Sequence, residues 1–96
     1  MIEKQISQTL VLHKKFFQGC LIKLYKKENG ATKGGETVFD LLIQVNGVIE
    51  KTTVTKSDIQ DQEYISCLKQ VFARVRFKNL QIKEPLHALF PLNTEL

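Results

Sequence analysis

The sequence predicts an α+β fold whose elements follow in the order helix, strand, strand, helix, strand. Between Phe39 and Val45 every second residue is apolar, the spacing that places side chains on one face of a strand. A reversal at Asn46 and Gly47 leads into residues 48–55, which are rich in β-branched side chains. From residue 61 to residue 75 apolar residues recur every three or four positions, which is typical of an amphipathic helix. The two middle strands therefore form a hairpin that is followed at once by a helix.

The ends of these elements carry local signals. Asn46 and Gly47 both tolerate positive φ angles, so we expect a two-residue type I′ turn. The second helix has two candidate starts, a capping box formed by Ser57 and Gln60, or an Asp61 cap with an acidic first turn. We favour a turn at Ser57 and a helix over residues 61–75. Its basic end suits the negative end of the helix dipole.

A long first helix is expected over much of residues 2–27, where a wide apolar stripe recurs at helical spacing. Gly19 is a candidate bend within it. The sequence Glu-Asn-Gly at residues 28–30 is a natural stop, because Gly suits the left-handed position after a helix. Residues 31–36 are expected to form a loop before the first strand.

A third strand is expected over residues 86–92, bracketed by Pro85 and Pro91. Proline has no amide hydrogen to donate, so this strand is predicted at an edge of the sheet. Placing it beside the first strand gives a three-stranded antiparallel sheet of order 2-1-3, with both helices on one face. Each outer strand then has an unpaired edge.

Size and charge bound the function. A chain of 96 residues forms one domain, residues 1–96, and no apolar run approaches the roughly 20 residues that span a bilayer. We expect any membrane anchor to lie upstream. The net charge is +4, but residues 35–63 carry two Lys and six acids. The basic residues are expected mainly on the solvent side of the first helix, as Lys14, Lys15, Lys23, Lys26 and Lys27. A group of lysines on one helix usually forms a surface exposed to water. The alternatives are that it binds an acidic partner or a lipid surface.

The sequence gives little support for metal binding or catalysis. Cys20, Cys67, His13 and His87 lack the short paired spacing of a zinc site, and Cys67 has no evident base or oxyanion site. We therefore expect no enzyme activity, no metal and no cofactor. A small basic nucleic-acid-binding domain is the alternative function, supported only by the charge balance, because no strand face shows the aromatic spacing that stacks bases.

Several short motifs together carry a resemblance. They are Gly19-Cys20, Asn46-Gly47-Val48, Val54-Thr55-Lys56-Ser57, Cys67-Leu68, Val75-Arg76-Phe77 and Phe90-Pro91. This combination resembles the AgmX/PglI C-terminal domain, a family similar to the TonB C-terminal domain, over about residues 20–92, which is most of the chain. The chain departs from that pattern in having Tyr25, not a Tyr directly after the first Cys, and in a longer Lys-rich loop before the first strand.

The resemblance implies a role in protein interaction and does not imply a catalysed reaction. Domains of this kind lie at the periplasmic end of inner-membrane proteins and engage cell-envelope proteins for energy coupling, transport or gliding motility. We therefore expect a periplasmic protein-interaction module, tethered by a segment outside this chain, with no nucleic-acid partner. TonB-like domains use their last strand for short partner segments. Here that strand is Leu86, His87, Ala88, Leu89 and Phe90. We expect strand addition from a partner protein at its edge; the alternatives are a cap formed by residues 93–96 or self-pairing into a dimer.

Two structural predictions follow from the stripes. Cys20 and Cys67 fall on or beside the buried faces of two helices that cover the same sheet, so we expect a disulfide; the alternative is two buried free thiols. Four apolar residues should be buried together, namely Leu41, Ile43, Leu68 and Phe72.

Overall fold

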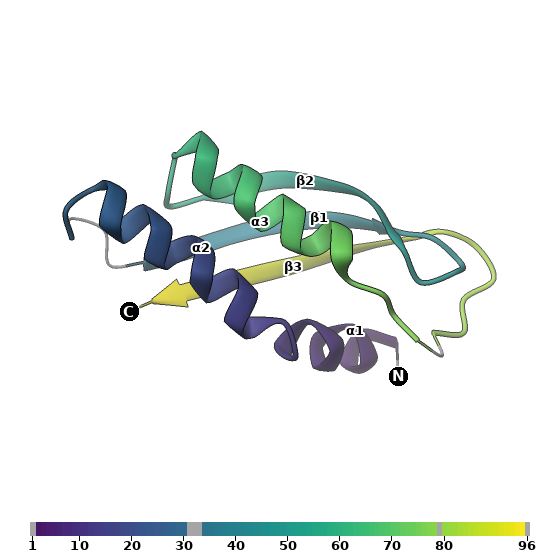
Figure 1. The fold of residues 1–96 in the computed structure, drawn as a ribbon. Coiled ribbons are helices and arrows are strands. Elements are labelled where there is room, and N and C mark those ends of the chain that lie inside the picture. Colours follow the sequence, from purple (N-terminus) through teal and green to yellow (C-terminus); the bar gives the residue numbers. More distant parts are fainter. Residues whose placement is uncertain (1, 31–33, 79, 96) are drawn as a thin grey trace.

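The computed structural model describes residues 2–30, 34–78 and 80–95 and contains two layers. Its helices and strands are α1 (Ile2–Val11), α2 (Lys14–Lys27), β1 (Gly34–Ile43), β2 (Ile49–Ser57), α3 (Gln62–Arg74) and β3 (Leu86–Glu95). The sheet is antiparallel with strand order β2-β1-β3. Helices α2 and α3 lie side by side on one face of this sheet (Figure 1). The predicted fold class and strand order are confirmed.

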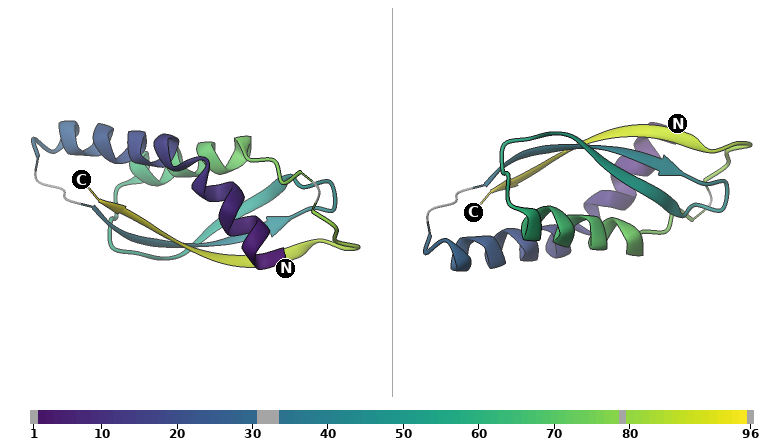
Figure 2. Two further views of the ribbon diagram at one scale, coloured as in Figure 1. Left: turned by 90° about the horizontal axis from the view of Figure 1, so that it is seen from below. Right: turned by 90° about the horizontal axis from the view of Figure 1, so that it is seen from above.

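The N-terminal segment is two helices, so the prediction of one helix with a bend at Gly19 is wrong. Gly19 lies within the continuous helix α2, and the chain breaks at Leu12 and His13. The amide of His13 donates to the carbonyl of Leu10 (3.0 Å), which tightens the end of α1. The break turns α1 out of the helix layer and towards the level of the sheet (Figure 2). Ile6 and Leu10 thereby join the core.

The hairpin turn also differs from the prediction. Gly47 has a positive φ of 83°, whereas Asn46 does not, so the turn is not type I′. The amide of Gly47 donates to Gln44 (2.9 Å), and the amide of Gln44 donates to Val48 (2.8 Å), which makes a longer loop that includes Val45. A tertiary contact accounts for the difference: the amide of Phe77 donates to the Gly47 carbonyl (2.9 Å).

The predicted C-terminal end of α2 and the predicted start of α3 are confirmed. Helix α2 stops at Lys27, and Asn29 and Gly30 follow in the left-handed region with φ of 53° and 83°. Asp61 caps α3, because its carboxylate accepts the amide of Tyr64 (2.9 Å). Ser57 makes a local turn instead, in which its hydroxyl oxygen accepts the amide of Ile59 (3.2 Å).

The core lies between the sheet and the two covering helices. Leu41, Ile43, Leu68 and Phe72 all have no exposed surface and belong to one cluster, as predicted. The ring of Phe72 is central, with centroids 4.9 Å from Phe17 and 4.7 Å from Phe39. The core therefore joins α2, α3 and β1 through three aromatic rings.

Candidate partner-binding edge

The structure places the five predicted site residues together at the start of β3, an outer strand that pairs only with β1 in the described sheet. Alternation divides them between two faces. Leu86, Ala88 and Phe90 are half-buried against the helix layer. His87 and Leu89 lie on the open face of the sheet, where Leu89 is 70% exposed. The candidate strand thus offers one face to the core and the other to solvent.

The position of Pro91 fixes which backbone groups of β3 face outward. Strand β3 runs to Glu95, past the predicted end, so Pro91 is an interior residue of the strand, opposite Val38, and does not border it. Proline has no amide hydrogen and cannot donate a hydrogen bond to β1. Because the pairing with β1 is unbroken at this position, the nitrogen of Pro91 faces away from β1. Because strand amides alternate in direction, His87 and Leu89 also point their amides outward. The amide of Ala88 points inward, to β1.

The two edges of the sheet differ in regularity. The pairing of β3 with β1 runs through ten residue pairs without a shift, from Gly34 with Glu95 to Ile43 with Leu86. The pairing of β2 with β1 shifts twice, and Glu50 and Thr55 are left without partners. Bulges of this kind bend a strand and disturb its outer hydrogen-bonding row. Strand β3 is therefore the regular edge of this sheet.

Helix α1 flanks this edge, a feature that sequence analysis missed. Figure 2 shows α1 descending from the helix layer to the level of the sheet beside β3. Its described side chains include two that are buried, Ile6 (4% exposed) and Leu10 (1% exposed). Covering an edge with a helix is one way that proteins protect it. The four-residue spacing of Ile6 and Leu10 predicted a buried face, but no residue pattern indicated the break that brings it here.

A hollow of about 240 Å³ continues the edge towards the end of β3. Leu10, Phe17 and Gln18 line one side of it, and the β3 segment 90–94 lines the other. The side-chain amide of Gln18 also donates to the carbonyl of Glu95 (2.6 Å). The mixed apolar and amide lining suits an apolar side chain that arrives on an extended backbone.

The two cysteines form the predicted disulfide, which joins α2 to α3 with a Cα–Cα distance of 5.8 Å. The alternative of free thiols is therefore wrong. A second hollow, of about 550 Å³, lies over this bond between the two helices. Lys27 bridges it at one end, with its ammonium 2.9 Å from the Asp61 carboxylate. The hydrogen bond between these two side chains raises the pKa of Lys27 and lowers the pKa of Asp61, because it favours the charged form of each, and the attraction of the opposite charges adds to it.

The other polar candidates are not brought together. His13 donates from Nδ1 to the carbonyl of Thr9 (3.0 Å), while His87 donates to the carboxylate of Asp40 (3.1 Å) on the open face of the sheet. Within residues 2–30, 34–78 and 80–95, no group of three or more His, Cys, Asp or Glu side chains is placed to hold a metal ion. None of the helices in that part of the chain is both long and apolar enough to cross a bilayer.

Comparison of the chain with family models, with curated proteins and with solved structures gives no significant match.

Proposed function

We propose that this chain is a protein-interaction module that binds an extended segment of a partner protein as an additional strand beside β3. The carrying observation is the unbroken register of β3, which leaves the amides of His87 and Leu89 in a regular outward row. Main-chain pairing supplies affinity in this mode. Selectivity comes from side-chain sites, here the open-face pair His87 and Leu89 and the hollow beside residues 90–94.

The cell envelope is the proposed location. The Cys20–Cys67 disulfide supports an oxidising compartment, because such bonds are rare where thiols are kept reduced. The resemblance to TonB-like domains supports the periplasm, an anchor in the inner membrane outside this chain, and a partner in energy coupling, transport or motility. Self-pairing of the same edge into a dimer competes with the partner segment for one row of hydrogen-bonding groups.

Helix α1 has to move for the segment to reach the first half of β3, because it lies beside that part of the edge (Figure 2). The cost of this movement is the exposure of Ile6 and Leu10. Weakening the contact should therefore raise the affinity for an added strand, since more molecules would have the edge open. An Ile6→Ala variant should bind more tightly than the unaltered chain.

The test begins with peptides selected from a random displayed library on the oxidised chain. Leu89→Pro removes one outward amide and should weaken a selected peptide at least about tenfold. The matched change at the other edge is Thr52→Pro, which should leave the affinity unchanged. Ala88→Pro is unsuitable, because it would break the β1 pairing itself.

Hydrogen exchange of the bound complex provides a second readout. Slower exchange of the His87 and Leu89 amides in the presence of the peptide is expected, because these amides gain acceptors. If Leu89→Pro stays folded and binds with unchanged affinity, strand addition at β3 is wrong. Protection confined to the helices would contradict it in the same way.

A further inference from the structure

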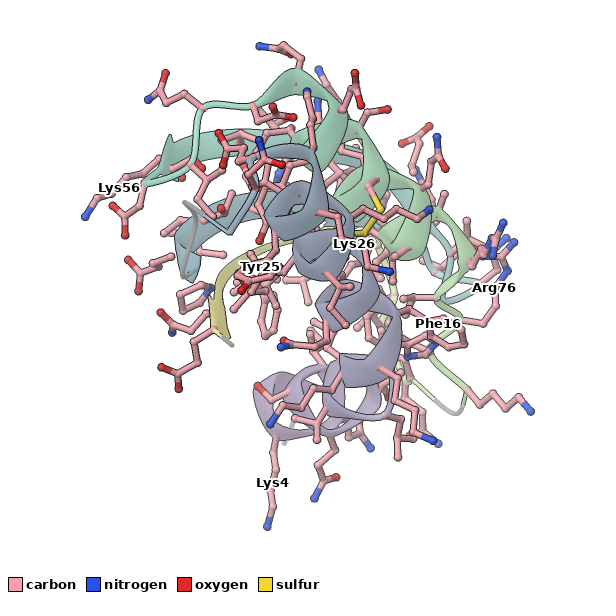
Figure 3. The ribbon with its side chains drawn as sticks, turned by 60° about the vertical axis from the view of Figure 1, so that its left-hand side comes forward. Lys4, Phe16, Tyr25, Lys26, Lys56 and Arg76 are labelled. Atoms are coloured by element: carbon pink, nitrogen blue, oxygen red, sulfur yellow. A yellow bond between two sulfur atoms is a disulfide. The ribbon has the colours of Figure 1, made fainter. Side chains whose placement is uncertain are left out.

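The outer surface of the helix layer carries basic residues without acidic neighbours in sequence. There is no Asp or Glu between Lys4 and Lys27, nor between Tyr64 and Lys83. Figure 3 shows Phe16 and Arg76 on the side of the molecule opposite Lys56 of β2, and Lys26 in front of the helices between them. We call this surface the basic helical face. Its members are Leu12, Lys15, Phe16, Ile22, Lys23, Lys26, Arg74 and Arg76.

Large apolar side chains project from the same face. Leu12 is 80% exposed, Phe16 is 58% exposed and Ile22 is 41% exposed. Leu12 and Phe16 lie four residues apart at the break between α1 and α2, and Val11 beside them is 65% exposed. The cost of leaving such side chains in water is large enough that clusters of them usually mark an interaction surface.

Asp61 and Glu63 lie beside the end of α2. Asp61 and Glu63 hold the ammonium of Lys27 at 2.9 and 3.5 Å, so this lysine is already neutralised. Among the described residues, no ion pair joins the lysines and arginines of the basic helical face to an acid. The charge of this face is complementary to a surface of negative charge, and the protruding aliphatic residues require that this surface also accept apolar groups.

We propose that the basic helical face docks on a bilayer surface that contains anionic phospholipids. In this arrangement Leu12 and Phe16 enter the boundary between headgroups and acyl chains, while Lys15, Lys23 and Lys26 lie among the phosphates. A nucleic acid would use the charge but gain little from Leu12 and Ile22, since base recognition relies on stacking and polar contacts. The inference is independent of strand addition, because it uses a different surface of the molecule.

The direct test uses tryptophan as a depth probe, because the chain contains none. Phe16→Trp should show a blue-shifted emission when the oxidised protein meets phosphatidylcholine vesicles that contain phosphatidylglycerol. Pure phosphatidylcholine vesicles should give no shift. The matched control is Leu89→Trp, on the open face of the sheet, which should give no shift with either vesicle.

Measurements of partitioning into vesicles separate the contribution of the lysines from that of the apolar side chains. Lys15→Gln and Lys26→Gln should each weaken binding to anionic vesicles about fivefold, and added salt should weaken it further. Leu12→Ser combined with Phe16→Ser should weaken it at least about tenfold. Two variants distant from the face, Lys56→Gln and Leu89→Ser, should bind as the unaltered chain does.

Three outcomes would overturn the proposal. The first is failure of the unaltered chain to bind anionic vesicles at low ionic strength. The second is equal loss of binding in Lys56→Gln and Lys15→Gln, which would show that net charge and not this face is responsible. The third is steeply salt-dependent binding to duplex DNA without binding to vesicles, which would assign the face to nucleic acid.

Discussion

The hydroxyl of Tyr64 lies 2.6 Å from the hydroxyl oxygen of Thr94, and this contact joins α3 to the end of β3. Both residues are buried, with 3% and 4% exposed surface. Thr94 also donates to the carbonyl of Gly35 at 3.5 Å, so the tyrosine is the donor to Thr94. The pair therefore fixes the end of the candidate binding strand against the helix layer.

Tyr64→Phe should lower the free energy of unfolding by about 1–2 kcal/mol, because it leaves the buried Thr94 hydroxyl short of a partner. Burial raises the pKa of Tyr64 above its usual 10.0. The folded protein thus resists ionisation of this group, and the associated stability is present below pH 10 and is lost as the pH rises beyond it. Urea titrations at neutral and alkaline pH should show a smaller alkaline loss in Tyr64→Phe. Tyr25→Phe, at an exposed position, is the control.

Reduction of the disulfide should destabilise the fold without abolishing it. The cross-link joins residues 47 positions apart, and the chain-entropy model gives about 4 kcal/mol for a loop of this length. Denaturation midpoints with and without reductant measure the effect. A Cys20→Ala/Cys67→Ala variant that matches the oxidised protein would show that the bond contributes nothing to stability.

Phe72→Ala should be among the most damaging substitutions, because the ring contacts Phe17 and Phe39 in a fully buried site. Truncation of a buried Phe costs about 3–5 kcal/mol. The exposed Lys69 on the same helix provides a control, since Lys69→Ala removes no buried contact. Equal midpoints for the two variants in chemical denaturation would place the core elsewhere.

Replacement by alanine should change the stability of the protein in opposite directions at Gly47 and Gly19. Gly47 has a φ of 83°, and a Cβ there would clash with the carbonyl oxygen of Phe77, so Gly47→Ala should be strongly destabilising. Gly19 lies within α2, and a Cβ there meets no atom within 4 Å. Gly19→Ala should therefore raise stability by about 0.5–1 kcal/mol. Thermal melts of both variants measure the contrast; a stabilised Gly47→Ala would contradict the turn geometry.

The sequence predicted the fold well where an element is determined by neighbouring residues. The periodicity of β1 and α3, the cap at Asp61 and the stop after Lys27 are all properties of a few neighbouring residues. The predicted type I′ hairpin turn was wrong, because Phe77, thirty residues away, contacts Gly47. The break at His13 was missed for a similar reason, since the core contacts of Ile6 and Leu10 determine where α1 must turn.

The candidate site was predicted in part. The edge position of β3 followed from its prolines, and the pairing of Cys20 with Cys67 followed from two stripes that cover one face. The flanking position of α1 and the continuation of β3 through Pro91 to Glu95 could not be derived. Both depend on register and tertiary packing, which a single sequence does not specify.

The two bulges of β2 determine how copies of this chain can assemble through their sheets. Head-to-tail stacking of β3 on β2 would repeat without end and form a fibre, but the shifted row of β2 offers no regular partner. Pairing of β3 with β3 is isologous and uses the regular edge of both copies. Such an assembly closes at two copies, with both irregular β2 strands outermost. The bulges of β2 therefore disfavour end-to-end polymerisation through the sheet, even where movement of α1 exposes the regular edge of β3.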